Sequence, residues 1–269
     1  MTAEVPARTV PGMRGPDAER KRDGLRSSLV WEVLDEVIAA RAAQSGRGVL
    51  DIVDVGAGTG GLAVSMAGRG HRVTVVDPSP DALAAARWRA AEAGVTLTEV
   101  QGEAVDLPAL VGEPGAGGAD GAGADLVICH SVLEYVDSPS AALAAIARVL
   151  RPGGTVSVLA ANSVAAVLQR ALAGRYAEAR ALLPGTAPAE GTAGKEAPRR
   201  FTLPELTALI EAAGLRAGDA HGIRIFSGLV PGAGAEPAAA EALRELEEAA
   251  ATCPPLRDIA ARLHVLARR

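Results

Sequence analysis

Aromatic residues are almost absent from this chain of 269 residues, which holds two Trp, two Tyr and two Phe. Proteins that bind single-stranded nucleic acid without sequence preference stack successive bases on aromatic side chains. The composition excludes a platform of that kind. Hydrophobic residues nevertheless make up 49 % of the chain, so a large core built from Ala, Val and Leu is expected.

Cysteine and long apolar runs are also scarce. The two cysteines, Cys129 and Cys253, are far apart and match no metal-ligand spacing, so no metal site is predicted. Cys129 lies in an apolar run and is expected to be buried. Residues 1–26 lack the apolar segment of a signal peptide, and no run reaches membrane-spanning length. We therefore expect a cytoplasmic protein without a membrane partner. No sequence feature indicates an oligomeric state.

Net charge is −5, which gives no overall attraction to nucleic acid but leaves room for a local basic patch. Residues 1–18 are rich in Pro and Gly and are predicted to be disordered. Residues 19–269 are predicted to form a single domain with a cofactor-binding core at 49–160. Residues 161–269 would supply a substrate-side insertion and the last strands. Segments 112–123 and 184–198 are predicted to be flexible.

The most informative stretch is a glycine turn after the apolar run 49–55. Gly56, Gly58 and Gly60 follow that run, Asp54 precedes them by two residues, and a helix is expected directly afterwards. Glycines permit positive φ and close approach of a ligand to the backbone. The dinucleotide fingerprint is Gly-x-Gly-x-x-Gly. The spacing here is Gly-x-Gly-x-Gly, which favours S-adenosylmethionine over a nicotinamide dinucleotide.

A second acidic residue supports this interpretation. Asp77 ends the β-branched run 72–76, about 20 residues beyond the turn, where an acid can accept hydrogen bonds from ribose hydroxyls. An alternative role is the N-cap of a helix that Pro80 and Asp81 would open. Both roles are compatible with the sequence.

The remaining pattern alternates short strands with helices, which predicts an α/β fold with a parallel sheet covered on both faces. Strands are expected at 49–55, 72–76, 96–100, 125–129, 155–160, 221–226 and 261–267. Helices are expected at 19–43, from 61, and at 81–93, 140–150, 164–183, 202–213 and 238–251. Thr202 and Glu205 have the spacing of a capping box.

Four motifs together resemble the class I S-adenosylmethionine-dependent methyltransferases. They are Asp-Val-Gly-Ala-Gly-Thr-Gly at 54–60, Val-Val-Asp at 75–77, Asp-Leu-Val-Ile-Cys-His-Ser-Val-Leu-Glu-Tyr-Val at 125–136 and Leu-Arg-Pro-Gly-Gly at 150–154. This resemblance implies a Rossmann-like, mostly parallel seven-stranded sheet with helices on both faces. A narrower resemblance is to the bacterial tRNA 5-carboxymethoxyuridine methyltransferase family, which esterifies a wobble-uridine carboxylate. The segments that are similar to this family lie at 24–31, 130–135, 173–174, 199–203, 222–226, 243–247 and 263–268.

The resemblance also implies a set of site residues. Asp54, Gly56, Ala57 and Gly58 would contact the cofactor, Asp77 its ribose, Ala104 and Val105 its adenine, and Arg26 its carboxylate. His130 would line the cofactor site. Two further readings of His130 are a structural histidine at the strand end and, for a hydroxyl or amine acceptor, a catalytic base. Candidate substrate-binding residues are Arg170, Arg175, Arg199, Arg200 and Arg224, together with Lys195.

The favoured function is therefore methyl esterification of a carboxymethoxyuridine in tRNA. A carboxylate is already ionised at pH 7, so this reaction needs no general base, and none is evident beside the motifs. Net negative charge, few aromatics and the reduction of the family's lysine-rich stretch before Arg199 to Lys195 favour a small-molecule carboxyl- or hydroxyl-methyltransferase instead. A non-catalytic cofactor-binding protein is the second alternative.

Overall fold

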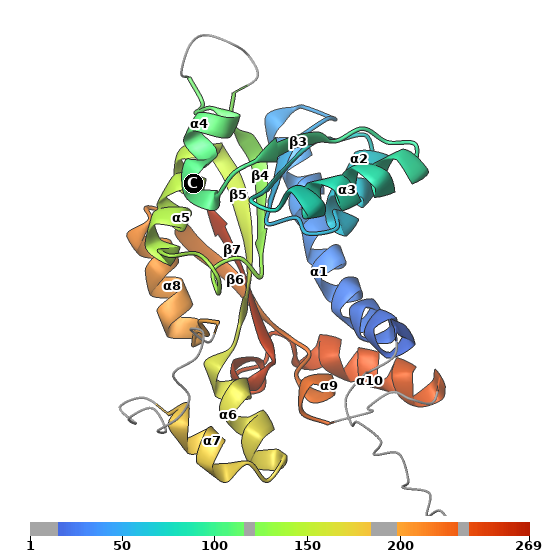
Figure 1. Ribbon diagram of the computed structural model, residues 1–269, viewed down its shortest axis with the longest axis vertical. Coiled ribbons are helices and arrows are strands. Elements are labelled where there is room, and N and C mark those ends of the chain that lie inside the picture. Colours follow the sequence, from blue (N-terminus) through green and yellow to red (C-terminus); the bar gives the residue numbers. More distant parts are fainter. Residues whose placement is uncertain (1–15, 116–121, 184–197, 231–236) are drawn as a thin grey trace, which may run out of the picture.

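The computed structural model describes residues 16–115, 122–183, 198–230 and 237–269, with side chains described from residue 29 onward. Seven strands form one sheet in the order β3-β2-β1-β4-β5-β7-β6 (Figure 1). The strands are β1 Asp51–Val55, β2 Arg72–Asp77, β3 Thr98–Gln101, β4 Ala124–His130, β5 Leu150–Ala161, β6 Arg216–Ile223 and β7 Arg262–Arg268. Strands β1 to β5 are parallel, and β7 pairs antiparallel with both β5 and β6. The predicted α/β fold with a mostly parallel seven-stranded sheet is confirmed.

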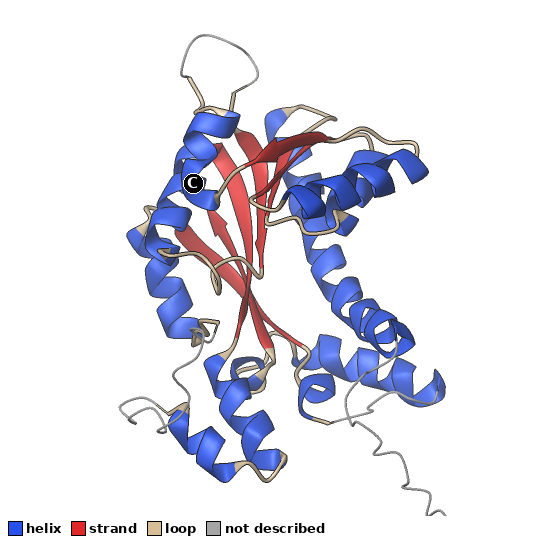
Figure 2. Cartoon of the chain, viewed as in Figure 1, coloured by secondary structure: helices blue, strands red, loops and turns tan. Residues whose placement is uncertain are grey.

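Helices cover both faces of this sheet (Figure 2). One face carries α1 Pro16–Ser45, α2 Gly61–Gly68 and α3 Pro80–Glu92, and the other carries α4 Leu107–Val111, α5 Pro139–Val149 and α8 Leu203–Ala212. Within the described residues, none of these helices has the length and apolar character needed to cross a bilayer.

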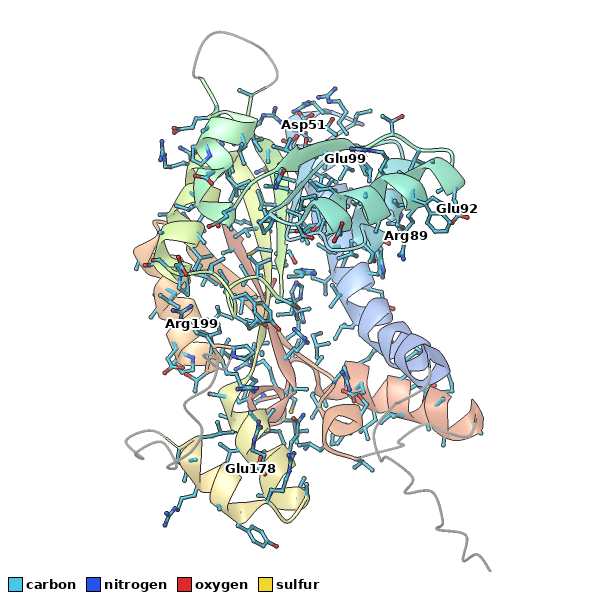
Figure 3. All side chains as sticks on the ribbon, viewed as in Figure 1. Asp51, Arg89, Glu92, Glu99, Glu178 and Arg199 are labelled. Atoms are coloured by element: carbon cyan, nitrogen blue, oxygen red, sulfur yellow. The ribbon has the colours of Figure 1, made fainter. Side chains whose placement is uncertain are left out.

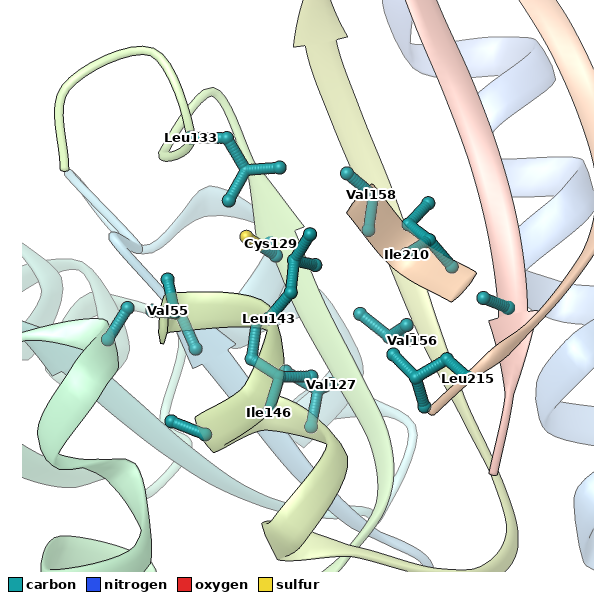
Figure 4. Close-up of a cluster of buried hydrophobic side chains, with 14 of the residues drawn as sticks. Val55, Val127, Cys129, Leu133, Leu143, Ile146, Val156, Val158, Ile210 and Leu215 are labelled. Carbon is teal, nitrogen blue, oxygen red and sulfur yellow. The ribbon is translucent and has the colours of Figure 1, made fainter. Parts of the chain in front are cut away.

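The larger part of the core lies between the sheet and the α5–α8 layer. Val127 and Cys129 of β4 pack there with Leu143 of α5 and Ile210 of α8 (Figure 4). Cys129 is fully buried, as its sequence context predicts, and burial raises the pKa of its thiol. Alternating residues of β4, such as Ile128, face the layer that contains α1. A central strand buried on both faces explains the continuous apolar run in its sequence.

Two predicted elements differ from the structure. The helix predicted at 164–183 is two helices, α6 Ser163–Leu172 and α7 Tyr176–Ala181, because Gly174 adopts φ 72° and ends the first one. The strand predicted at 221–226 begins earlier, as β6, and stops at Ile223. Short helix α9 (Phe226–Leu229) follows, and α10 (Pro237–Ala250) caps it: the Glu247 carboxylate accepts hydrogen bonds from the backbone N–H groups of residues 225–227.

Smaller corrections concern boundaries. Helix α1 begins at Pro16, three residues inside the segment 1–18 predicted to be disordered, because proline suits a first helical turn. The region predicted as a loop at 101–108 contains a 3-10 turn at Ala104–Asp106 and the start of α4. The predicted capping box of Thr202 and Glu205 is confirmed at the start of α8. Residues 1–15, 116–121 and 184–197, including most of the segments predicted to be flexible, lie outside the described residues.

A charged cluster closes the sheet edge at which the parallel strands begin. Asp125 is fully buried there and accepts hydrogen bonds from Arg41, Arg47 and Arg151 at 3.1, 3.0 and 2.8 Å. Burial alone would raise the pKa of neighbouring Asp51, but hydrogen bonds from arginines, Arg72 first, hold it well below its usual range. Asp51 lies at the end of the sheet opposite to α6 and α7 (Figure 3).

We expect Asp125→Ala to lower the free energy of unfolding by about 3–5 kcal/mol, because it removes a buried carboxylate that pairs with three arginines and leaves Arg47 and Arg151 to share Asp51. Urea unfolding would measure this loss. Asp35→Ala is the matched control, since Asp35 pairs with Arg69 at the exposed surface, where such pairs contribute about 0–1 kcal/mol. Equal losses in the two variants would contradict the expectation.

Candidate active site

The glycine turn lies at the carboxyl end of β1, the edge at which open α/β sheets bind ligands. Gly56, Gly58 and Gly60 all have positive φ, at 63°, 53° and 71°. The Gly56 N–H donates to Val76 O at 2.7 Å, which fixes the turn against β2. L-residues with side chains pay about 1–2 kcal/mol for this conformation. The glycine spacing in the sequence is therefore required by the backbone.

Asp77 supports the turn from the end of β2. Its Oδ2 accepts the Gly58 N–H at 3.1 Å and its Oδ1 accepts the Ser79 N–H at 2.9 Å. The helix that follows is capped by Ser79, whose hydroxyl accepts the Ala82 N–H, so the alternative role of Asp77 as N-cap is wrong. A carboxylate has about four acceptor positions. Asp77 therefore has capacity left for a ligand.

Two cavities meet at the turn. The larger, about 630 Å³, is lined by Asp54, Ala57, His130 and Arg262 among others, and the smaller, about 320 Å³, by Asp77, Ala104, Val132 and Tyr135 among others. Gly56 and Ser131 border both. Both volumes suit a small organic ligand. A bipartite ligand could therefore extend across the turn, with its centre beside Gly56 and Ser131.

Asp54 lines the larger cavity and is almost completely buried. Burial, and then the negative charge of Asp77, raise the pKa of its carboxyl to about 7. A carboxyl group in this position is stabilised in its charged form by a bound cation. The chemistry of the larger cavity thus suits a ligand with a positive charge near Asp54.

The predicted loop residues differ in their placement. Ala104 is buried and lines the smaller cavity, whereas Val105 is half exposed and is not among the residues that line it. The 3-10 turn at Ala104–Asp106 directs these neighbours to different sides. Arg26 lies in α1, among the residues whose side chains are outside the description.

His130 ends β4 and belongs to a row of polar groups beneath α1. Its Nε2 shares a hydrogen bond with Ser157 Oγ at 2.7 Å, and the same hydroxyl bonds to His264 Nε2 at 2.8 Å. The His264 ring stacks on His221, at 5.5 Å between ring centroids. Burial, and then the neighbouring His221, lower the pKa of His264 to about 3. These contacts fix the orientation of the His130 ring. Because His130 also lines the larger cavity, it can still contact a bound ligand.

Sequence reasoning missed Ser131, Glu134 and Arg262. Ser131 adopts φ 61°, and its hydroxyl accepts a hydrogen bond from Arg262 Nη1 at 2.6 Å. Glu134 Oε1 accepts the Ala161 N–H at 2.9 Å and lies 3.5 Å from Arg262 Nη1. Glu134 thus holds the end of β5 in place. Arg262 reaches the site because β7 runs antiparallel to β5, which no local sequence signal specifies.

The fold brings only some of the predicted substrate-binding arginines together. Arg170 contacts Glu178 at 3.7 Å, and Arg175 pairs with the same carboxylate at 3.3 Å. Burial, and then the charge of Arg170, lower the pKa of Arg200. These residues therefore lie near one another, around α6 and α7. Figure 3 shows Glu178 on α7.

The other predicted basic residues have separate positions. Arg199 donates to the carbonyls of Val136 and Asp137, so it fixes the loop after β4 to the start of α8. Arg224 has φ 60° and lines a small hollow with Leu29 and Glu247. Lys195 lies outside the described residues.

Comparison with known proteins finds similarity to methyltransferases. The model of a methyltransferase domain matches residues 53–158. The tRNA 5-carboxymethoxyuridine methyltransferase of Escherichia coli O157:H7 is 29 % identical over 247 residues, covering 91 % of this chain and 88 % of that protein. The ubiquinone biosynthesis O-methyltransferase of Xanthomonas campestris pv. campestris (strain B100) is 35 % identical over 151 residues, covering 56 % of this chain and 58 % of that protein.

A solved structure shows the same fold. Magnesium protoporphyrin IX methyltransferase from Synechocystis PCC 6803, solved with bound SAH, superposes with a TM-score of 0.57 at 16 % identity. The superposition covers 97 % of this chain and 90 % of that one. The likeness thus includes both the sheet and its surrounding helices.

Proposed function

Because the chain is a methyltransferase that uses S-adenosylmethionine, we propose that it esterifies a carboxylate, and that its acceptor is a 5-carboxymethoxyuridine in tRNA. One observation supports this choice of acceptor. The similarity to the tRNA 5-carboxymethoxyuridine methyltransferase covers 91 % of the chain, so it extends well beyond the methyltransferase domain matched at 53–158. A relative that shares only the cofactor-binding part would not match the substrate side.

The two cavities fit the cofactor as a bipartite ligand. The backbone at Gly58 leaves room for close approach, since a Cβ there would meet nothing within 4 Å, whereas a Cβ at Gly56 would lie 2.6 Å from Val132 Cγ2. Asp77 would accept hydrogen bonds from the ribose, and Ala104 would contact the adenine. Asp54 would face the cationic part, and Arg26 would pair with the carboxylate. S-adenosylmethionine supplies an electrophilic methyl group when it is bound.

Besides binding the cofactor, the site has to position the acceptor against the methyl group. A carboxylate acceptor is ionised at neutral pH, so no side chain has to remove a proton from it. Holding the reacting atoms about 3–3.5 Å apart, in a cavity from which water is displaced, supplies much of the rate. The fixed orientation of His130 by Ser157 fits such a rigid wall. His130 acts here as a contact residue, and a base role would apply only to a protonated acceptor.

The affinity for S-adenosylmethionine should depend on pH through Asp54. Its pKa of about 7 in the free protein means that the carboxyl is protonated below neutrality, and a bound cation favours the ionised form. Binding should be tight above pH 7 and weaken as the pH falls, by at most about tenfold per pH unit. Calorimetric titration between pH 5.5 and 8 would measure this slope. Asp54→Asn should bind more weakly and lose that component of the slope; an unchanged slope would contradict the assignment.

The test of the acceptor uses bulk tRNA from cells of the same source that lack the protein. Purified protein is incubated with this tRNA and methyl-labelled S-adenosylmethionine, and the label in tRNA is treated with mild base. Base-labile incorporation indicates a carboxyl ester and supports the proposal. No incorporation by protein that binds the cofactor would exclude tRNA as the acceptor.

A small-molecule carboxyl- or hydroxyl-methyltransferase is the second candidate. It is favoured by the 35 % identity to a ubiquinone biosynthesis O-methyltransferase over 151 residues and by the net charge of −5. A tRNA assay without incorporation would direct the search to small acids and alcohols. The non-catalytic alternative is not retained, because the methyltransferase domain and its relatives identify an enzyme.

A further inference from the structure

One cation in the wall of the larger cavity has no assigned role. Arg262 is the first residue of β7, and about three quarters of its side chain is buried, at 26 % exposure. Its Nη1 donates to Ser131 Oγ at 2.6 Å. Since Ser131 borders both cavities, the guanidinium is held beside the junction at which the two halves of the cofactor would meet.

The contacts of Arg262 leave much of its binding capacity open. A guanidinium has five N–H donors in a planar fork that matches a carboxylate. In the described part of the chain, Ser131 accepts the one hydrogen bond that this guanidinium donates, and Glu134 forms an ion pair with the same Nη1 at 3.5 Å. Glu134 Oε1 is itself engaged by the Ala161 N–H. The neighbouring groups therefore fix Arg262 in place without filling its fork.

We propose that Arg262 binds the carboxylate of the methyl acceptor and so selects acids over alcohols and amines. This inference rests on the proposed function. A sulfonium and a guanidinium in one cavity repel each other, because both are cations and the surroundings are partly buried. A carboxylate between them is attracted by both groups. A neutral hydroxyl acceptor would form neither of these attractions, because it carries no charge.

The chemistry balances without a proton. A carboxylate oxygen supplies the electron pair of the new carbon–oxygen bond, and the carbon–sulfur bond breaks with its pair left on sulfur. The anion and the sulfonium are both neutralised. The ester product no longer forms an ion pair with Arg262, which favours its release. Arg262 would thus both select an acidic acceptor and favour release of the ester product.

Binding measurements test this assignment apart from catalysis. The probes are the nucleoside 5-carboxymethoxyuridine and its neutral carboxamide, titrated calorimetrically into protein saturated with S-adenosylhomocysteine. Wild-type protein should prefer the acid, and Arg262→Gln should weaken acid binding by about 30-fold or more while amide binding is unchanged. Arg262→Lys keeps the charge without the fork and should be intermediate. S-adenosylhomocysteine affinity should stay within about threefold in both variants, since the demethylated product carries no sulfonium.

Arg268→Gln is the matched control, because Arg268 lies exposed at the other end of the same strand. It should leave both titrations unchanged. If wild-type protein binds acid and amide equally, or if Arg262→Gln retains the preference, the assignment is overturned. If Arg262→Gln does not fold, Arg262→Lys with full acid affinity overturns it as well. Acid preference without tRNA methylation would exclude tRNA and leave the carboxylate site in place.

Discussion

Asp77→Ala is expected to weaken S-adenosylmethionine binding by about 100-fold. Two hydrogen bonds from ribose hydroxyls to a charged acceptor are lost, each contributing about 1.5 kcal/mol or more. The turn loses support as well, because Asp77 holds the Gly58 N–H at 3.1 Å and the Ser79 N–H at 2.9 Å. The carboxylate therefore acts both on the ligand and on the backbone that receives it.

Equilibrium binding of S-adenosylmethionine to the folded variant would measure this loss. Asp81→Ala is the matched control: Asp81 lies in the first turn of α3, four residues from Asp77, and its side chain is exposed. It removes the same charge without removing a contact to the turn. Asp77→Asn, which keeps one acceptor oxygen, should lie between the two. Binding by Asp77→Ala within about threefold of wild type would rule out the ribose role.

Gly60→Ala is expected to destabilise the fold by about 2–5 kcal/mol, combining a left-handed conformation with overpacking. Gly60 is the N-cap of α2 and has φ 71°. A Cβ there would lie 2.7 Å from the Ala86 Cβ and 3.1 Å from the Ala86 Cα, so neither partner can rotate away. Helices α2 and α3 would have to separate, and the cofactor turn lies directly before α2.

Gly70→Ala distinguishes the cost of the left-handed backbone conformation from the cost of overpacking. Gly70 follows α2, has φ 89°, and a Cβ there would meet nothing within 4 Å, so only the backbone cost of about 1–2 kcal/mol should appear. Chemical denaturation of both variants, with S-adenosylmethionine binding as a second readout, would measure the difference. Equal destabilisation would show that contact with Ala86 contributes nothing.

The sequence predicts those parts of the molecule that depend on local signals. Glycine spacing and a β-branched run place the turn and Asp77 correctly, because positive φ and strand preference act over a few residues. Gly174 divides α6 from α7 for the same reason, yet residues 171–173 and 175–177 continue the helical pattern on either side and conceal the break. The sequence predicts that Val105 contacts the adenine together with Ala104, but in the 3-10 turn Ala104 is buried and Val105 is half exposed.

Long-range pairing explains what the sequence does not predict. Arg262 meets Ser131 across 131 positions of the chain, and Ser157 meets His264 across 107. Both contacts require β7 to lie beside β5 in one register, with Ala161 opposite Arg262. A shift of one residue would turn these side chains to the other face. Periodicity identifies β7 as a strand but contains no information about its neighbour.

The position of β7 has a consequence for how the protein is made. Strand β7 follows β6 in the chain, yet it lies between β5 and β6 in the sheet. While β7 is still being synthesised, β5 has an unpaired edge, and such edges pair readily with other chains. Among the described strands, β6 pairs with β7 alone, so it too stays unpaired at this stage. Until β7 pairs, β5 therefore keeps an edge that other chains could join, and the wall of the larger cavity that carries Arg262 is not in place.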